Sequence, residues 1–598
     1  MKNQPENKNN AQPFAGKRKA YLALGAVAAI LVIGIIAAFV LLKGNHEVRA
    51  YQEKSEILKA ETLTQIVKWE LGDAPAGAVG HAVFLSVCDG EQRASVFSGT
   101  GADLDDAWEN ANKRAESAIK KDKLAPNWVK ADVVYISETV DTATLNQAIA
   151  NSRSEFLRYG IAFDSNYQTA LLEAELNGYK IYDYENGTIN LDYLNRYLKK
   201  AGRDQVSALP ETYTVFRTFS RFCDEENRVY HLDADGLDYG RRTTELIDAA
   251  YAEELIATAS DYLAGQIKED GSFVYGYYPR FDNKIENYNM LRHAGTVWSL
   301  VCRYRMTEDP ELAETIELAI DYMLNQLVYR DENTAYLYEA KADEIKLGGC
   351  GIAIVALTEY MEAFESDKYL DVCRKMGNGI LSLMDRTDGT YYHVLNGDFS
   401  QKEEFRTVYY DGEATFALCR LYGVTGDQVW LDAAKSAVGH FIAADYVQHR
   451  DQWVAYSMNE ITKYVDDPGY YAFALRNVQE NYDKINRETT APVTFELLLA
   501  TFELYDRLIQ KGAAIGGFNH EEFMKTIYAR ADRMLDGYFY PEYAMYMENP
   551  GRILGAFMVR EDGYRTRIDD VQHCIGGYYL YQKNYDKLVS YGILEYRN

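Results

Sequence analysis

Carboxylates stand beside tyrosines at the starts of apolar helical segments in the C-terminal half of the chain. Asp411 follows Tyr409 and Tyr410 where one such segment begins, and Asp569 and Asp570 open another. Two carboxyl groups can act as general acid and general base when one has a raised pKa and the other stays ionised. We therefore expect Asp411 and Asp570 to form an acid/base pair.

Other polar residues at the same helix starts could orient a substrate. His293 is expected to be a third titrating or orienting group, and Arg292 and Arg567 could hold an anionic group because guanidinium groups bind carboxylates through two N–H donors. The expected substrate-binding residues are Tyr409, Tyr410, Arg292, Arg567, Asn287, Glu488 and Asp569. The alternative is structural, because acidic residues favour the first turn of any helix and arginines pair with neighbouring carboxylates.

Residues 241–598 repeat one unit with a period of about sixty residues, which is typical of stacked or closed repeat architectures. Each unit has an amphipathic helix, a short aromatic hairpin and a second helix that is apolar and rich in small residues. The first helices are expected at 245–266, 309–327, 367–384, 427–444 and 519–536. The second begin near 289, 347, 411 and 569, with helical segments near 468 and 490. A helix that is apolar all round is buried, so the second helices should form an inner ring.

The aromatic segments GSFVYGYY, TAYLYEA, GTYYHVL, QWVAYSM, YAMYMEN and GRILGAFMV are expected to be strands. With QWVAYSM as a strand, the pattern predicts eleven helices rather than twelve.

Three segments, YYDGEATFALCRLY, KLGGCGIAIVALTEY and RIDDVQHCIGGYYLY, resemble those of the six-hairpin glycosidases and their relatives, such as the N-acylglucosamine 2-epimerases and unsaturated glucuronyl hydrolases. The resemblance covers residues 241–590 and lies in the architecture. It implies a mainly α protein whose main domain is an (α/α)6 toroid, in which the loops that enter the inner helices line one mouth. It also implies a carbohydrate substrate and a glycoside hydrolase or related acid/base enzyme. The arginines at the helix starts favour an anionic glycan.

Two other functions fit the same toroid. The first is a non-catalytic glycan-binding or cell-envelope scaffold protein that uses the aromatic mouth. The second is a zinc-dependent protein similar to the lanthionine cyclases, with Cys350 and the pair His573–Cys574 as ligands. The order of that pair is reversed from the expected one, and no third ligand is evident. We therefore predict neither a metal nor a cofactor.

The N-terminal region predicts a membrane anchor. Residues 21–42 form an uncharged apolar span that follows Lys17, Arg18 and Lys19, which places residues 1–20 in the cytoplasm and the body outside it. A cleaved signal peptide is the alternative. Residues 43–72 read as a stalk and 73–240 as a small α+β region. The net charge of −27 argues against nucleic-acid binding.

Overall fold

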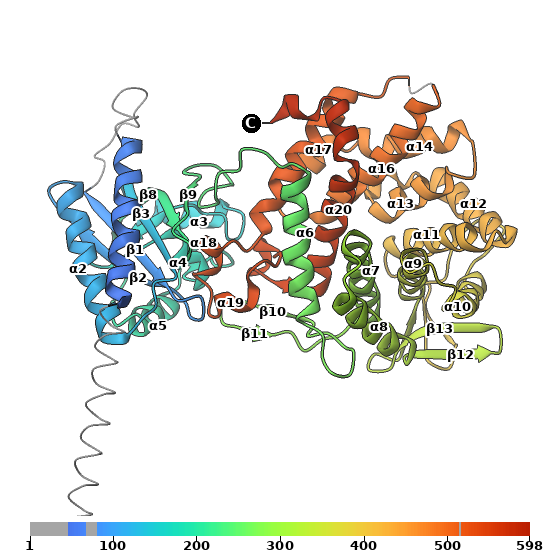
Figure 1. Cartoon of the computed structure of the whole chain (residues 1–598), viewed down its shortest axis with the longest axis horizontal. Helices are drawn as coiled ribbons and strands as arrows, with labels where there is room; N and C mark the ends of the chain where they lie inside the picture. The colour runs from blue at the N-terminus through green and yellow to red at the C-terminus, as the bar shows by residue number, and fades with distance from the viewer. Residues whose placement is uncertain (1–45, 67–80, 165, 514–515, 598) are drawn as a thin grey trace, which may run out of the picture. The chain divides into compact units, whose positions relative to one another are not determined.

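The computed structural model describes residues 46–66, 81–164, 166–513 and 516–597 (Figure 1). The predicted tail at 1–20 and the predicted transmembrane segment at 21–42 lie outside these residues. Within the described part of the chain, no helix is both long enough and apolar enough to cross a bilayer. The chain forms two compact units, each described separately below.

Unit 1 is an α+β unit made of the described residues up to Asp89, Ala94–Ile136 and Ser220–Tyr230. Its central strand β1 (Ala82–Cys88) pairs antiparallel with β2 (Ser95–Thr100) and with β3 (Trp128–Asp141). The amphipathic helix α2 (Leu104–Asp122) packs on β1 and β2 through its buried face. Asp103 caps α2 by accepting the N–H of Asp106, as an aspartate at this position is expected to do.

The predicted stalk is a helix over residues 46–66, and it belongs to unit 1. Tyr51 and Ser55 lie one turn apart on the same face of this helix. The Tyr51 hydroxyl donates to Asn112 Oδ1 at 2.7 Å, and Trp108 Nε1 donates to Ser55 Oγ at 2.9 Å. These contacts pack residues 46–66 against α2 instead of leaving them as a free-standing stalk.

Unit 2 contains the toroid together with residues 137–219, so the chain does not divide at the predicted boundary of 240/241. In this segment β4 (Gly160–Ala162) pairs with β5 (Ala170–Leu171) and with β8 (Thr212–Cys223), which crosses the division between the units at its end. Arg560 of the toroid donates to the carbonyl of Glu155 at 2.9 Å and to Glu173 Oε1 at 3.0 Å. The shorter elements of this segment are α3 (Thr142–Asn151), α4 (Glu173–Gly178), β6 (Tyr182–Asp183), β7 (Thr188–Ile189) and α5 (Leu191–Lys200).

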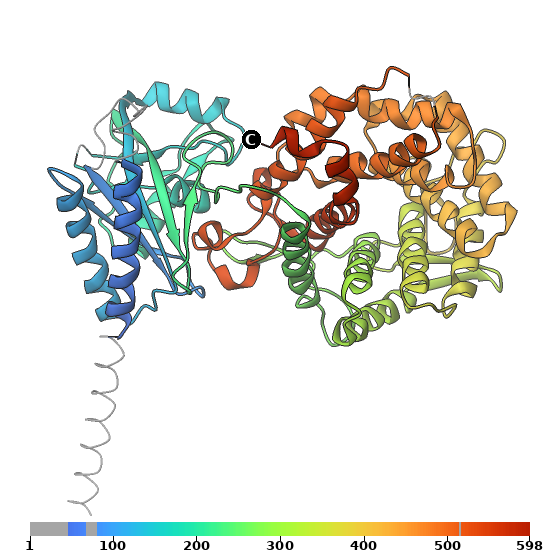
Figure 2. The same ribbon diagram turned by 45° about the horizontal axis from the view of Figure 1, so that its top comes forward.

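Helices of the toroid alternate between an inner and an outer ring (Figures 1 and 2). The inner helices are α7 (Met290–Thr307), α9 (Leu347–Ala363), α11 (Tyr409–Thr425), α13 (Gln452–Ile461), α16 (Pro492–Gln510) and α20 (Ile568–Ser590). The outer helices are α6 (Ala249–Ala264), α8 (Pro310–Leu324), α10 (Leu370–Ser382), α12 (Gln428–Ala443), α14 (Pro468–Gln479) and α17 (His520–Met534). Each inner helix packs on the next, and α20 packs on α7, which closes the ring. The described residues thus contain six helical hairpins, as an (α/α)6 toroid requires.

The twelfth helix is α13, whose sequence QWVAYSM was predicted to be a strand. Every residue from Gln452 to Ile461 is buried, so the segment has no exposed face that would reveal helical periodicity. A short, mostly apolar run cannot be told from a buried strand by periodicity alone. The prediction of eleven helices was wrong for this reason.

Two small antiparallel sheets lie at the starts of inner helices. One has the order β11 (Asn283–Lys284), β10 (Gly276–Tyr278) and β17 (Thr566–Arg567), and β17 leads directly into α20. The other has the order β12 (Leu327–Asp331), β13 (Thr334–Glu339), β14 (Glu344–Lys346), β15 (Val394–Leu395) and β16 (Gln401–Glu403). The segments YAMYMEN and GRILGAFMV, also expected as strands, contain the short helices α18 (Pro541–Ala544) and α19 (Pro550–Ile553).

Small residues on the inner helices make room for carboxyl groups of neighbouring helices. A Cβ added to Gly348 of α9 would lie 1.8 Å from Glu413 Oε2, and one added to Gly576 of α20 would lie 2.5 Å from Glu496 Oε1. No side chain fits at such distances, so these glycines are required for the carboxyl groups to point between the inner helices. The small-residue pattern of these helices therefore serves polar residues as well as close helix packing.

Candidate functional site

His573 lies between two carboxylates near the N-terminal ends of the inner helices. Asp569 and His573 are one turn apart on α20 and share a face. His573 Nδ1 lies 2.6 Å from Glu496 Oε2 on α16, and its Nε2 lies 3.7 Å from Asp569 Oδ1, too far for a hydrogen bond. Burial lowers the pKa of His573, but the negative charges of Glu496 and Asp569 outweigh burial and raise it overall.

Arginines hold Asp569 in place. Arg292 Nε at the start of α7 donates to Asp569 Oδ2 at 2.9 Å, and Arg567 Nη2 donates to the same oxygen at 3.1 Å. Arg292 also donates to the hydroxyl of Tyr275. Arg292, Arg567 and Asp569 were all expected to bind substrate, and the structure brings them together within reach of His573.

Two further carboxyl groups are buried behind this cluster. Glu413 on α11 and Asp451 at the start of α13 each have one oxygen, Oε2 and Oδ2, with no hydrogen-bond partner among the described residues. Burial, with the charges of Asp451 and Asp569, raises the pKa of Glu413 well above its usual range. Burial, with the charge of Asp411, does the same for the pKa of Asp451. Both environments therefore favour the neutral, protonated form of the acid.

Asp411 has partners at both carboxylate oxygens. His393 Nε2 donates to Oδ1 at 2.8 Å, and the Tyr446 hydroxyl donates to Oδ2 at 2.6 Å. The tautomer of His393 follows from its other nitrogen, because Nδ1 accepts the backbone N–H of Arg406 at 3.0 Å. The acid/base role predicted for Asp411 stays a prediction, but its contacts are those of a buried structural partner.

Asp570 is also fully engaged. Its carboxylate accepts hydrogen bonds from Arg565 and Arg567 and from the backbone N–H of Arg567 at 3.0 Å, which caps α20. Burial raises the pKa of Asp570, but the two arginines outweigh burial and lower it overall. A carboxylate so stabilised is a weak base, so the acid/base role predicted for Asp570 also stays a prediction.

His293 does not face the mouth where we expected it. Its ring lies against the outer helix α8, with Nδ1 2.8 Å from the Tyr288 hydroxyl and Nε2 2.9 Å from the carbonyl of Ala319. Burial lowers its pKa to about 4. Neighbours on a helix point about 100° apart, so when Arg292 faces the ring interior His293 faces away from it.

The remaining predicted residues differ in exposure. Tyr409 is 42% exposed and is open to a ligand, whereas Tyr410 is buried beside the ring of His393. Glu488 pairs with Arg450 at 3.2 Å. Asn287 is exposed, and Asn289, two residues later, caps α7.

The predicted acid/base and substrate-binding residues did not include Glu413, Asp451, Glu496 or His573, and His573 was considered only as a possible zinc ligand. One signal could have found Glu496, because it is the only charged residue in the apolar run APVTFELLLA. A lone acid in a buried helix must have a specific partner, and here the partner is His573.

The cysteines proposed as zinc ligands have other contacts. Cys350 Sγ accepts the backbone N–H of Leu337 at 3.3 Å, and the neighbour of Cys574, His573, is occupied by Glu496. Among the described residues, no group of three or more His, Cys, Asp or Glu side chains could hold a metal ion.

No family model and no curated protein matches the chain. Similar solved structures include a cellobiose 2-epimerase from Spirochaeta thermophila DSM 6192, with 13% identity, a TM-score of 0.44, and 57% of this chain and 98% of that chain covered. A D-mannose isomerase has 11% identity and a TM-score of 0.43 over 56% and 98% of the two chains. An alpha-1,6-mannanase from Salegentibacter sp. HEL1_6 has 11% identity and a TM-score of 0.28 over 55% and 98%. The expected resemblance to six-hairpin toroids is confirmed, and the fold assignment rests on the closed ring of helical hairpins.

Proposed function

We propose that the toroid acts on a carbohydrate by acid/base chemistry at the N-terminal end of its inner helices. The observation that carries this proposal is His573, which is held at Nδ1 by Glu496 and presents Nε2 toward Asp569. A histidine of raised pKa, oriented by one carboxylate and facing another, is a general acid for a sugar oxygen. Its side chain is 12% exposed, so a ligand can reach it.

Each group then has a defined task. His573 Nε2–H donates a proton to the reacting oxygen, while Glu496 fixes the ring and stabilises its charge. The carboxylate of Asp569, held by Arg292, accepts a proton from a hydroxyl or water or stabilises positive charge on the sugar ring. The environment of Glu413 behind them favours its protonated form, which makes it a second candidate proton donor.

One feature favours a substrate with an anionic group. Arg292 Nη2 makes no hydrogen bond among the described residues, and the side chain is 31% exposed. The carboxylate of a uronate could bind at this nitrogen, and the exposed ring of Tyr409 could stack on the sugar.

The test is an activity screen of the purified protein against neutral and uronate-containing glycans. Release of reducing ends reports hydrolysis, and chromatographic separation of sugar isomers reports epimerisation. His573→Asn should lose the activity, whereas His440→Asn on the outer helix α12 should keep it. Equal activity of the two variants would refute the assignment of His573.

The second candidate function is glycan binding without turnover. Aromatic rings inside the toroid favour it, because they stack on sugars whether or not a reaction follows. In the same screen, this function predicts retention of a glycan with neither reducing-end release nor isomerisation.

We infer that residues 21–42 anchor the protein in a membrane, with the N-terminus in the cytoplasm and the body outside. The uncharged span and the preceding basic residues Lys17, Arg18 and Lys19 support this inference. Protease added to intact cells stripped of their outer layers should digest the body. A body that is digested only after membrane lysis would show the opposite orientation.

A further inference from the structure

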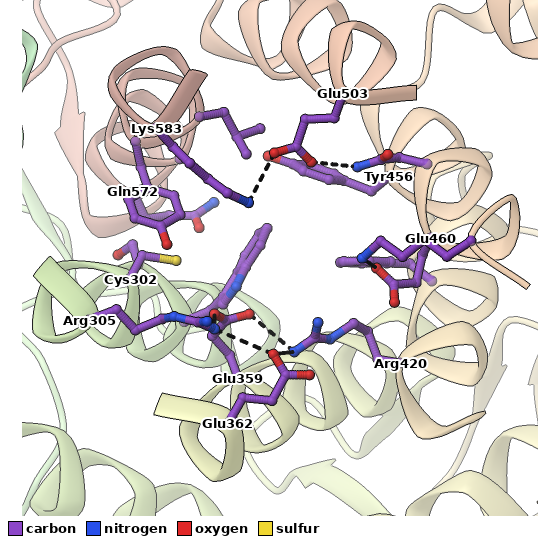
Figure 3. A pocket seen from close by; sticks show the side chains of 18 residues that line it. Cys302, Arg305, Glu359, Glu362, Arg420, Tyr456, Glu460, Glu503, Gln572 and Lys583 are labelled. Carbon is purple, nitrogen blue, oxygen red and sulfur yellow. Dashed lines mark hydrogen bonds and ion pairs between the residues drawn. The ribbon is translucent and has the colours of Figure 1, made fainter. Parts of the chain in front are cut away.

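A cavity of about 260 Å³ opens at the other end of the inner ring, among the C-terminal halves of the inner helices (Figure 3). All six inner helices or the residues directly after them contribute to its lining. The site around His573 lies at the helix starts, whereas the charged groups of the cavity lie toward the helix ends. The inner part of the cavity approaches that site, because Gln572 and Gly576 of α20 line it and Gly576 lies against Glu496. Tyr456 provides a hydrogen bond between the two features, described below.

The charged groups around this cavity pair with one another. Glu359 on α9 forms ion pairs with Arg305 and with Arg420, the latter at 3.2 Å. Burial raises the pKa of Glu359, but Arg420 and Arg305 outweigh burial and lower it overall. The other pairs are Arg420–Glu362 at 3.0 Å, Lys583–Glu503 at 3.0 Å and Lys463–Glu460. The lining thus carries four cationic and four anionic side chains.

This balance selects against charged ligands. A ligand with a net charge would have to separate an existing ion pair, which is costly at the buried groups Glu359 and Arg420. A neutral polyol can accept hydrogen bonds from the arginines and lysines and donate to the glutamates while the ion pairs stay intact.

The inner part of the cavity has aromatic rings and unsatisfied donors. The rings of Trp298, Phe416 and Tyr456 pack together, with centroids 5.3 to 6.1 Å apart. Trp298 is 8% exposed, and its Nε1–H has no hydrogen-bond partner among the described residues. Gln572 also lines the cavity and brings an amide that can donate and accept hydrogen bonds. A buried donor without a partner is unfavourable, so the Trp298 Nε1–H points to a ligand that completes it.

We propose that this cavity is a second carbohydrate site, which binds one neutral sugar ring. Pockets for drug-sized ligands measure about 300–1,000 Å³, so the volume here suits a smaller molecule. The apolar face of the sugar would stack on the aromatic rings, and a hydroxyl would accept the Trp298 Nε1–H. The proposal does not depend on catalysis at His573, because different side chains carry it.

The test is calorimetric titration of the purified protein with D-glucose, D-galactose and D-mannose, and with D-glucuronate as the charged counterpart. We expect at least one neutral hexose to bind, with D-glucuronate binding to this site at least about tenfold more weakly. Uronate binding that survives the cavity-filling change described next belongs to the His573 end of the ring.

Cys302 lines the cavity and gives a matched pair of variants. Cys302→Leu fills part of the space and should weaken hexose binding at least about tenfold, whereas Cys302→Ala leaves the space open and should bind as the native protein does. Trp298→Phe keeps the ring but removes the N–H donor, so it should weaken binding even if Cys302→Leu does not fold. His573→Asn should change hexose affinity by less than about fivefold, because only the hydrogen bond from Tyr456 to Glu496 couples the cavity to His573.

Four results would overturn the proposal. The first is the absence of binding by all three hexoses. The second is equal binding by D-glucuronate that is lost together with hexose binding in Cys302→Leu. The third is native affinity for the hexose in folded Cys302→Leu and Trp298→Phe. Loss of hexose binding in His573→Asn would instead assign the bound sugar to the catalytic end, and would likewise overturn it. Loss of turnover in His573→Asn tests the proposed enzyme separately.

Discussion

Two glutamates inside the same ring, Glu413 and Glu359, have opposite environments. Both are buried, yet the pKa of Glu413 is raised well above its usual range and that of Glu359 is lowered. The difference lies in their neighbours, because Glu413 faces other carboxyl groups and Glu359 faces Arg305 and Arg420. Burial favours the neutral acid, and only a paired cation reverses that preference.

The comparison extends to the two ends of the ring. At the N-terminal ends of the inner helices lie carboxyl oxygens and one arginine nitrogen that have no partner among the described residues, together with a histidine whose pKa is raised. The C-terminal end has ion pairs that balance one another around an aromatic cavity. The first arrangement suits proton transfer and the second suits recognition of a neutral molecule, so one fold can separate chemistry from binding along its axis.

The largest effect should come from His573→Asn. Loss of a general acid typically lowers the rate by about 10²- to 10⁴-fold, and Asn keeps one hydrogen bond to Glu496 so that the fold survives. Turnover of the substrate found in the glycan screen is the measurement, with His440→Asn as the control. A loss of less than tenfold, with thermal stability unchanged, would mean that His573 is only a structural partner of Glu496.

The second largest effect is on the free energy of unfolding, and it compares Glu359→Gln with Glu413→Gln. Glu359→Gln removes the negative charge between Arg305 and Arg420 and should cost about 2 kcal/mol of unfolding free energy, since both arginines then have only Glu362 as an anionic partner. Glu413→Gln replaces a protonated acid by a similar neutral group and should cost under about 1 kcal/mol. Urea unfolding of both variants measures the difference. Equal losses would show that the two ends do not differ in charge state.

The sequence predicted the architecture better than the site. Helix periodicity and small residues identify the inner and outer rings, because the pattern of buried residues within a single helix can be read from its local sequence. The pairing of Glu496 with His573 and of Glu413 with Gly348 joins helices that are far apart in sequence, so no local pattern specifies it. His293 was expected to face the interior of the ring, but its side chain contacts the outer helix α8. A difference of one position on a helix turns a side chain by about 100°, and the sequence did not show which of Arg292 and His293 faces inward.

Stability should depend on pH in opposite ways at the two ends. The folded pKa of Glu413 is raised, so the folded state holds a proton that the unfolded state releases above the ordinary value of 4.5, and stability falls as the pH rises past that value. The folded pKa of Glu359 is lowered, so its contribution is present above 4.5 and is lost as the pH falls through the folded pKa.

The two Gln variants isolate these contributions. Compared with the native protein, Glu413→Gln should flatten the decline of stability above pH 4.5, and Glu359→Gln should flatten the loss below it. Urea unfolding between about pH 3 and pH 9 gives both curves. Parallel curves for the native protein and Glu413→Gln would contradict a protonated Glu413.

The smallest effect concerns communication between the two ends. The ring of Tyr456 lines the cavity, while its hydroxyl donates to Glu496 Oε1 at 3.0 Å, on the carboxylate that holds His573. A sugar that shifts this ring would weaken or strengthen the hydrogen bond and so change the basicity of Glu496 and the pKa of His573. The coupling should alter turnover by about 2- to 5-fold, since it acts through one hydrogen bond, and it should move the alkaline limb of the pH–rate profile. Tyr456→Phe keeps the ring but removes the hydroxyl, so its turnover should no longer respond to the neutral hexose that binds the cavity. A response of equal size in Tyr456→Phe and the native protein would show that the hexose acts by another route, such as direct competition at His573.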